Sequence, residues 1–466
     1  MAVPQKVRSS ERQTLLPTNR ATNRPRVGHP FMRVLHAVIF VTLLVIAWHT
    51  LAHSRLPHRR PSTPTPSAPA WPESLRTHCA NIAPITGEEF LSRQNALAEV
   101  LHNAGGASYI AEPGASAGYF ANLSGQAWGL SERPLLLIVS PTVSSDKVLP
   151  KITILTPTFE ATRAKGLALA GNDIEYVSWA EYENPFEVAV GAGVLSADSP
   201  VYVDGMTRQF IVAGFQAQGA RVEVAPTEVK LLRERKSAAE IEILKCVNEA
   251  TVLAVRAVRE RMHIGSRESE VQALVADALG FAGLTGGWGL VLFGENAALP
   301  HGSGSDRELG PEDFALLDIG GSLHGYVSDV TRTFALQETK LSSRQLDIWN
   351  LVQAAQTQGL KTAGGGVIAK DVDAAARSVI TVAGLGKYFT HRLGHGIGLE
   401  VHEAPYLVGG SKDVLRPGHT FSDEPGVYIE GEVGVRLEDC FYIDADGSAV
   451  YLTEGVGGQA LSPWQP

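Results

Sequence analysis

The chain has 466 residues, 44% of them hydrophobic and 47 of them glycines, a composition that fits two well-cored α/β or α+β domains. The net charge of −9 is uneven: residues 1–60 hold ten Lys or Arg and one acid, so the remaining 406 residues carry −18. This acidic body excludes nucleic acid as the main partner, because phosphate binding needs a basic face. Three cysteines exclude a disulfide framework. We expect Cys246 and Cys440 to be buried free thiols, and a bridge from Cys79 stays open.

A stretch of 19 residues without Lys, Arg, Asp or Glu, 34–52, follows a basic start. As a helix rising about 1.5 Å per residue it just spans a hydrocarbon core of about 30 Å. We predict a disordered basic cytosolic tail over 1–33, an uncleaved transmembrane signal anchor over 34–52 and a Pro-rich stalk over 53–71. The excess of Lys and Arg before the span predicts a single-pass membrane protein whose remaining chain is lumenal or extracellular. A mitochondrial presequence is the alternative address.

Residues 72–226 alternate helical and strand-like patterns and predict an α/β domain. An amphipathic helix is expected over 87–104, and the apolar runs 135–139 and 151–155 are expected to be strands. This segment has no cluster of His, Asp and Glu and no Gly-rich phosphate loop. We therefore expect it to act as a partner or gate for a second domain.

The second domain is predicted over 227–466. The pattern SerAlaAlaGlu at 237–240 is typical of a capping box at a helix start. Apolar residues then recur at steps of three and four, from Leu244 to Val258, which gives the helix one apolar face. Another helix is expected to begin near Ser266.

Four carboxylates lie in two pairs of strand-like segments in this domain. Asp318 ends an apolar strand and Asp329 lies in the β-rich segment that returns, so a hairpin would bring them together. Glu424 and Glu438 repeat the arrangement further along the chain. Four buried carboxylates would repel one another and lose their hydration, so burial implies cations. The alternative is that they lie on solvated strand faces.

Three histidines, His391, His395 and His402, lie four and seven residues apart in the Gly-rich segment 391–403. A single histidine is most often a satisfied core residue, whereas three together beside glycines favour chemistry. His395 lies between the two carboxylate pairs in the sequence. The five residues together form a donor set suited to a pair of divalent cations.

These motifs resemble the aminopeptidase P/prolidase family, the proline-specific metallopeptidases of the pita-bread fold shared with creatinase and methionine aminopeptidase. The resemblance covers residues 227–460 and, more weakly, 72–224. It rests on AspIleGlyGly (318–321) with GlyTyrValSerAspValThrArgThrPhe (325–334), HisArgLeuGlyHisGlyIleGlyLeuGluValHisGlu (391–403), GluProGlyValTyr (424–428) and GlyValArgLeuGluAsp (434–439). It implies an α+β fold class: a C-terminal pita-bread domain after a smaller α/β creatinase-type domain. The single N-terminal transmembrane helix is added from residues 34–52.

The resemblance also assigns roles to matching positions. Five residues match the metal ligands, with the second and the last as the bridging pair: Asp318, Asp329, His395, Glu424 and Glu438. Four further residues match site positions: His301, which contacts substrate; His402, which steadies the tetrahedral intermediate; His391, which lines the same pocket; and Arg436, which steadies ligands.

Two cations would share a water and lower its pKa, so that a metal-activated hydroxide attacks the peptide bond. Glu424 is the expected general base, and His402 would offset charge on the carbonyl oxygen. One nitrogen ligand among oxygens favours Mn²⁺, with Co²⁺, Fe²⁺ and Zn²⁺ as alternatives. The chain departs from the family at Ser422, where Thr is frequent, and at Asp423, which we expect to raise the pKa of its neighbour Glu424.

The predicted function is dinuclear metal-dependent hydrolysis of peptide bonds adjacent to proline, as an Xaa-Pro aminopeptidase or an Xaa-Pro dipeptidase. The expected partners are proline-containing peptides, the membrane and a second copy of the chain in a homodimer. Two alternatives stay open: a creatinase-like hydrolase that is not a peptidase, and a membrane-tethered binding protein that has lost catalysis. The five intact ligand positions argue against both.

Overall fold

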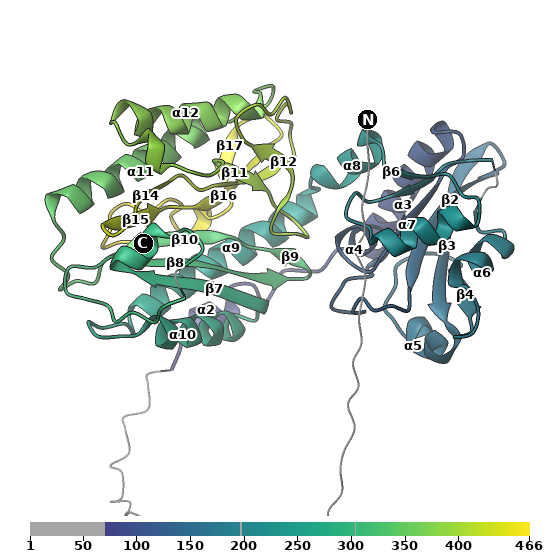
Figure 1. Cartoon of the computed structure of the whole chain (residues 1–466), viewed down its shortest axis with the longest axis horizontal. Helices are drawn as coiled ribbons and strands as arrows, with labels where there is room; N and C mark the ends of the chain where they lie inside the picture. The colour runs from purple at the N-terminus through teal and green to yellow at the C-terminus, as the bar shows by residue number, and fades with distance from the viewer. Residues whose placement is uncertain (1–69, 196–197, 303) are drawn as a thin grey trace, which may run out of the picture. The chain divides into compact units, whose positions relative to one another are not determined.

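The computed structural model describes residues 70–195, 198–302 and 304–466, and Ala70–Pro466 forms one compact unit. An N-terminal arm leads into a mixed sheet, and further helices and sheets follow (Figure 1). The predicted boundary between 226 and 227 falls at the start of α8 (Thr227–Glu234).

The first sheet has six strands in the described residues, in the order β4-β3-β2-β1-β5-β6. Its strands are β1 (Ser108–Ala111), β2 (Leu136–Ser144), β3 (Lys147–Pro157), β4 (Glu175–Trp179), β5 (Val201–Val203) and β6 (Val222–Val224). Its helices are α3 (Gly87–Asn103), α4 (Ala115–Ala121), α5 (Ala161–Lys165), α6 (Pro185–Gly191) and α7 (Gln209–Ala217). The predicted helix and both predicted strands are confirmed as α3, β2 and β3.

Alternating side chains along these strands build a core on each face of the sheet. Tyr109 and Leu137 pack with α3 and α4 on one face, and Ile110 and Leu136 pack with α6 and α7 on the other. Helix α3 starts at the N-cap Thr86, whose side chain accepts a hydrogen bond from the backbone N–H of Glu89. This domain is therefore a layered α/β unit, as the alternating pattern predicts.

The rest of the described chain contains two groups of strands, each covered by a pair of helices. The strands are β7 (Thr285–Phe293), β8 (Ala315–Leu323), β9 (Tyr326–Val327), β10 (Val330–Phe334), β11 (Gly394–Gly396), β12 (Glu403–Leu407), β13 (Thr420–Asp423), β14 (Gly426–Ile429), β15 (Val433–Arg436), β16 (Asp439–Ile443) and β17 (Ala449–Tyr451). The helices are α9 (Ala238–Arg259), α10 (Glu268–Phe281), α11 (Ser343–Thr362) and α12 (Ala369–Val382).

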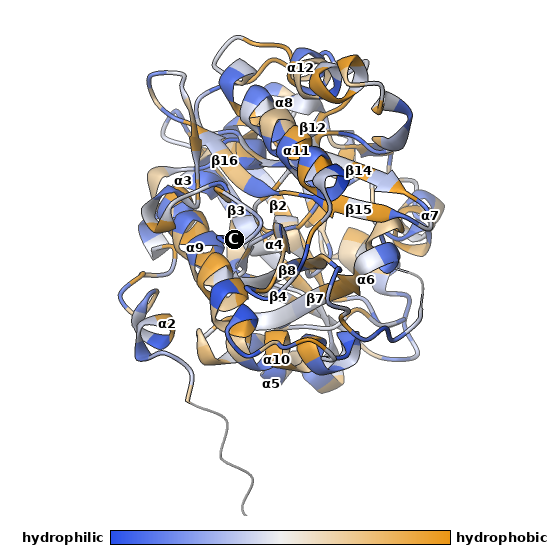
Figure 2. Cartoon of the chain, turned by 90° about the vertical axis from the view of Figure 1, so that its left-hand side faces the viewer, coloured by the Kyte–Doolittle hydropathy of each residue, from blue (hydrophilic) through white to orange (hydrophobic). Residues whose placement is uncertain are grey.

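Helices α9 and α10 pack on β8 and β10, while α11 and α12 pack on β13 to β16. The predicted capping box is confirmed: Ser237 and Glu240 exchange side-chain and backbone hydrogen bonds at the start of α9. Figure 2 shows apolar and polar residues alternating around α9, as expected for a helix with one buried face.

The predicted tail over 1–33, the predicted transmembrane helix over 34–52 and almost all of the predicted stalk lie outside the described residues. Within the described ranges, no helix combines the length and the apolar character that a membrane crossing needs. The longest helices there, α9 and α11, carry charged residues along one face. We therefore correct the fold class to a pita-bread domain after an α/β domain, and we withdraw the transmembrane helix and the single-pass membrane location.

The prediction of a free thiol at Cys246 is wrong, because this residue forms a disulfide with Cys79. The bridge joins the arm before α3, which includes α2 (Glu73–Thr77), to α9. Cys440 is free and buried, as predicted.

Candidate metal centre

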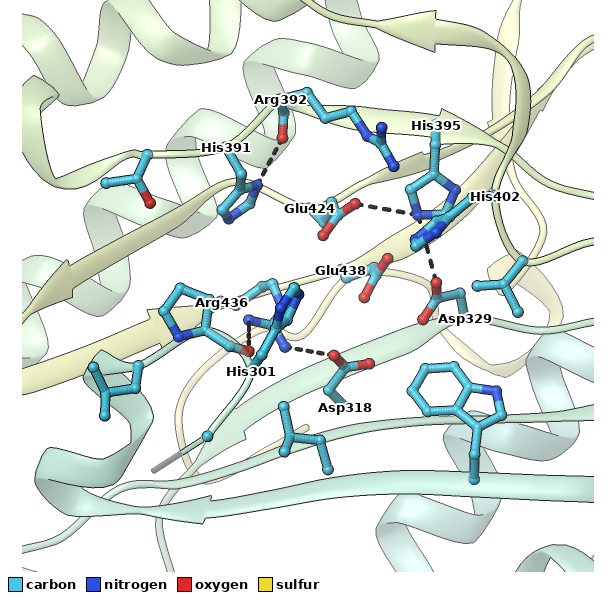
Figure 3. A pocket seen from close by; sticks show the side chains of 17 residues that line it. His301, Asp318, Asp329, His391, Arg392, His395, His402, Glu424, Arg436 and Glu438 are labelled. Carbon is cyan, nitrogen blue, oxygen red and sulfur yellow. Dashed lines mark hydrogen bonds and ion pairs between the residues drawn. The ribbon is translucent and has the colours of Figure 1, made fainter. Parts of the chain in front are cut away.

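The predicted hairpins bring the four carboxylates together. Strands β8 and β10 pair antiparallel with Asp318 opposite Thr331, and Asp329 immediately precedes β10. Strands β13 and β16 pair with Asp423 opposite Asp439, so Glu424 and Glu438 flank this pair on the same side. His395 lies on β11, which pairs with β13. All five predicted ligand residues therefore meet where the two groups of strands face each other (Figure 3).

These side chains form overlapping groups whose donor atoms lie within 4.8 Å of one another. One group contains Asp318, Asp329 and Glu438, and another contains His395, Glu424 and Glu438. The His395 Nε2 lies 3.2 Å from Glu424 Oε1 and 3.5 Å from Asp329 Oδ2. Because the groups share members, the five residues form one continuous cluster rather than two separate sites.

The buried carboxylates of the cluster repel one another strongly. Burial, followed by repulsion from neighbouring carboxylates, raises the pKa of Asp329 and of Glu438 well above the ordinary range. Burial also raises the pKa of Asp318, against the nearby Arg436. Burial alone would raise the pKa of Glu424, but the hydrogen bond and charge of His395 lower it to about 2.

The residues present fit divalent cations. Asp318 Oδ1 and Glu438 Oε1 are buried and have no hydrogen-bond partner in the described structure. The His395 Nδ1–H donates to the Gly396 carbonyl oxygen at 3.1 Å, which leaves the unprotonated Nε2 facing the carboxylates. Buried acceptors without donors are costly, and a cation satisfies them. The donor set, mostly oxygen with one nitrogen, suits a hard or borderline divalent metal.

Arg436 lies beside the cluster, at the position predicted for it. Its Nη2 donates to Asp318 Oδ2 at 2.5 Å, its Nε to Thr331 Oγ1 at 3.1 Å and its Nη1 to the hydroxyl of Tyr428 at 3.0 Å. Thr331 in turn donates to Glu438 Oε2 at 2.6 Å. One guanidinium thus orients carboxylates from both strand pairs.

Ser422 and Asp423, the two departures from the family pattern, have different surroundings. The Ser422 hydroxyl accepts from the backbone N–H of His395 at 3.1 Å and donates to Glu424 Oε1 at 3.3 Å. Asp423 is fully buried and lies against α11 at Gly359. The expectation of a raised pKa at Glu424 is wrong, because the hydrogen bond and charge of His395 lower that pKa to about 2.

A cavity of about 1070 Å³ opens beside the cluster and is lined by all of the predicted site residues. Its apolar wall consists of Trp288, Leu290, Leu299, Pro300 and Val401. This combination of apolar wall and converging polar groups is typical of a small-ligand site. The volume is enough for a short peptide.

The three remaining predicted histidines border this cavity (Figure 3). The ring of His402 lies 4.2 Å from that of His395, edge to face, and burial together with the charge of His395 lowers its pKa. His391 donates from Nδ1 to the carbonyl oxygen of Arg392 at 2.7 Å, and its Nε2 lies 2.9 Å from the Tyr428 hydroxyl. Burial lowers the pKa of His391, so it is neutral near pH 7. His301 reaches the cavity without a hydrogen bond in the described structure.

Two residues of the site were missed from the sequence. Tyr428 links His391 to Arg436, and it lies within a motif already recognised. Arg392 lines the cavity with its guanidinium 4.7 Å from the ring of Tyr406. The signal that could have found Arg392 is a basic residue directly beside the clustered histidines.

Comparisons with known proteins agree with this geometry. The model of metallopeptidase family M24 matches residues 242–445. An uncharacterized peptidase of Schizosaccharomyces pombe is 40% identical over 392 residues, which cover 82% of this chain and 84% of the relative.

Solved structures are also similar. Dipeptidase PepE from Mycobacterium ulcerans superposes with a TM-score of 0.70 at 31% identity, over 79% of this chain and 97% of that chain. An Xaa-Pro dipeptidase from Bacillus anthracis superposes with a TM-score of 0.66 at 28% identity, over 79% and 98% of the two chains. The resemblance inferred from the sequence motifs is thereby confirmed: this chain is a peptidase that belongs to metallopeptidase family M24.

Proposed function

We propose that the protein is a dinuclear metallopeptidase that hydrolyses Xaa-Pro dipeptides. The observation that carries the proposal is the pair of ligand groups that share Glu438. Asp318, Asp329 and Glu438 would hold one cation, and His395, Glu424 and Glu438 would hold the other, with Asp329 as the second bridging residue. Mn²⁺ is the ion we favour, since oxygens dominate the donor set.

When bound, the cations would supply a water of lowered pKa and would polarise the scissile carbonyl. Glu424, held ionised by His395, would take up the proton that this water loses. His402 lies on the cavity wall with a lowered pKa and would donate a hydrogen bond, as the neutral imidazole, to the carbonyl oxygen. His391, fixed by Arg392 and Tyr428, and His301 would border the bound substrate.

Arg392 supports a dipeptide rather than a longer substrate. Its guanidinium has no carboxylate partner in the described residues and contacts the ring of Tyr406 instead. The terminal carboxylate of a dipeptide would complement this cation, because guanidinium and carboxylate pair with two parallel hydrogen bonds. The apolar wall around Trp288 suits a proline ring. The similarity to an Xaa-Pro dipeptidase points the same way.

The test is a comparison of initial rates for Ala-Pro, Ala-Pro-amide, Ala-Pro-Ala and Ala-Ala after loading with Mn²⁺. We expect kcat/KM for Ala-Pro to exceed that of the amide roughly 10- to 100-fold, the effect of one charged hydrogen bond. EDTA should abolish turnover. Equal rates on Ala-Pro-Ala would favour an aminopeptidase, and no turnover of Ala-Pro by metal-loaded protein would refute the proposal.

The homodimer stays a prediction. Sedimentation velocity at micromolar concentration measures the oligomeric state directly, and a monomer at all concentrations would contradict the prediction.

A further inference from the structure

A buried ion pair lies at the start of β12, directly after His402. The Lys236 Nζ is 2.5 Å from Glu403 Oε1, and both side chains are 2% exposed. The same ammonium donates to the carbonyl oxygens of Arg233 and Glu234, each at 3.1 Å. All three of its protons are therefore used, as a buried ammonium requires.

The pair connects two distant parts of the chain. Lys236 lies in the short link between α8 and α9. Glu403 is the first residue of β12 and directly follows His402. Arg233 adds an ion pair to Glu400 and donates to Ser116 Oγ at 3.2 Å. The end of α8 is thus fastened both to α4 and to the segment before β12.

The glycine-rich segment leaves room for this pair. A Cβ on Gly398 would lie 2.7 Å from Lys236 Cε and 2.8 Å from Glu403 Oε1. Gly398 therefore lets the backbone fold directly over the ion pair. The backbone N–H of Val327 donates to the Gly398 carbonyl oxygen at 2.9 Å, which ties the segment to the strand next to the metal cluster.

His402 lies in the bend directly before β12, so it is the residue next to Glu403 along the backbone. Glu403 contacts Lys236, whereas the ring of His402 borders the metal cavity and lies 4.2 Å from that of His395. The pairing of β11 with β12 shifts register between His395 and Gly396, and Gly396 pairs with Glu403. The ion pair therefore fixes the residue directly after His402, which restricts the backbone that carries the histidine.

We propose that Lys236 and Glu403 are positioning residues that hold His402 in its reactive orientation. Neither side chain lines the metal cavity, so each acts through the backbone next to His402 rather than on the substrate. The inference rests on the role given to His402 in the proposed function.

The test is a double-mutant cycle between Glu403→Gln and His402→Ala, measured as kcat for Ala-Pro with metal content determined for each variant. A misplacement of about 1 Å lowers a rate roughly 100-fold, so Glu403→Gln should lower kcat by about that factor with KM and bound metal unchanged. In the His402→Ala background, Glu403→Gln should have no further effect on kcat. Multiplicative losses in the double variant would overturn the proposal, because a general structural role acts independently of His402.

A second measurement does not depend on activity. Hydrogen exchange of the amides of 401–404, 406 and 407 should speed up in Lys236→Met, since Glu403 then keeps only the ion pair of its Oε2 with Arg233 Nη2 at 3.6 Å. The matched control is Arg93→Met, which breaks an ion pair to Glu240 that is similarly buried, 5% and 1% exposed, but is not on this strand. Unchanged exchange in Lys236→Met, or an equal change in the control, would overturn the proposal even if Ala-Pro proved not to be the substrate.

Discussion

The five residues proposed as metal ligands illustrate how a binding site can lower the stability of the fold that contains it. Without a cation, Asp318 Oδ1 and Glu438 Oε1 are buried acceptors with no donor in the described structure. Burial and mutual repulsion raise the pKa of Asp329 and Glu438, which means that their ionised forms destabilise the folded state. We therefore expect metal binding at this cluster to be coupled to folding.

Replacement of Asp329 by Asn tests this coupling. Asn keeps the shape and removes one charge, so metal-free Asp329→Asn should be more stable than metal-free wild type by roughly 1–3 kcal/mol. Mn²⁺ at 100 times its Kd should add about 2.7 kcal/mol to the wild type and much less to the variant. Thermal unfolding with EDTA and with Mn²⁺ measures both effects, and Asp347→Asn on the exposed side of α11 is the control. A variant that is less stable without metal would contradict this account.

Arg392 is expected to bind the carboxylate of the substrate. Arg392→Gln keeps part of the side chain and removes the charge. It should raise KM for Ala-Pro roughly 10- to 100-fold and leave KM for Ala-Pro-amide almost unchanged, because the lost contact is one charged hydrogen bond. Steady-state kinetics on both substrates check this. An equal rise of KM for both would assign Arg392 a structural role.

His419 makes stability depend on pH. Both of its ring nitrogens are buried without a hydrogen bond in the described structure, and burial, followed by the charges of Lys236, Arg235 and Arg416, lowers its pKa to about 4. In the unfolded chain the pKa of His419 is near 6.5, so between about pH 6.5 and 4 His419 takes up a proton only in the unfolded state. Stability from this group is complete above pH 6.5 and falls as the pH falls, by up to about 3 kcal/mol.

The variant His419→Leu lacks this proton uptake. Its unfolding free energy should therefore fall less than that of the wild type between pH 7 and pH 4.5, a difference that urea unfolding at both pH values measures. Parallel losses in the two proteins would show that His419 is charged in the folded state.

At the scale of elements, helices and strands were predicted correctly from the sequence where a single local pattern determines them. The capping box at Ser237 and Glu240 and the apolar steps along α9 are local patterns, and both appear in the structure. The antiparallel pairing of β8 and β10, which brings Asp318 near Asp329, followed from strand patterns broken by glycine. The pKa of Glu424 was wrongly predicted because its determinant, His395, lies far away in sequence and only the fold brings it near.

The spacing of β11 and β13 depends on a glycine. A Cβ on Gly394 would overlap the carbonyl oxygen of Ser422, whose hydroxyl contacts both His395 and Glu424. Gly394→Ala should therefore separate the strands, lower stability by about 1–3 kcal/mol and weaken metal binding. Thermal unfolding and metal titration measure the two effects. The control is Gly409→Ala, where a Cβ would meet nothing within 4 Å, and it should change neither stability nor metal binding. A Gly394→Ala variant with unchanged stability and metal binding would contradict the strand spacing described.

At the scale of the whole molecule, the sequence could not predict how the arm before α3 is held. Cys79 and Cys246 are 167 residues apart, and no local pattern relates them. The pairing exists because the arm packs against α9, where His78 Nε2 also lies 2.8 Å from Glu249 Oε2. The bridge closes a loop that contains the complete six-stranded sheet. It therefore links the start of the N-terminal domain to the helix that follows it.

Reduction of this bridge should lower stability without slowing the reaction. A closed loop of this length restricts the unfolded chain, so reduction, or the double variant Cys79→Ser with Cys246→Ser, should lower the unfolding free energy by about 2–5 kcal/mol. Activity should persist below the unfolding temperature, because α9 keeps its capping box and its Asn248 Oδ1 still accepts from the backbone N–H of Asp329 at 3.4 Å. Thermal unfolding and Ala-Pro hydrolysis with and without a reducing agent measure both. The single variant Cys440→Ser, which leaves the bridge intact, controls for the loss of a thiol. A lower kcat in folded, reduced protein would mean that the bridge also affects the geometry of the metal centre.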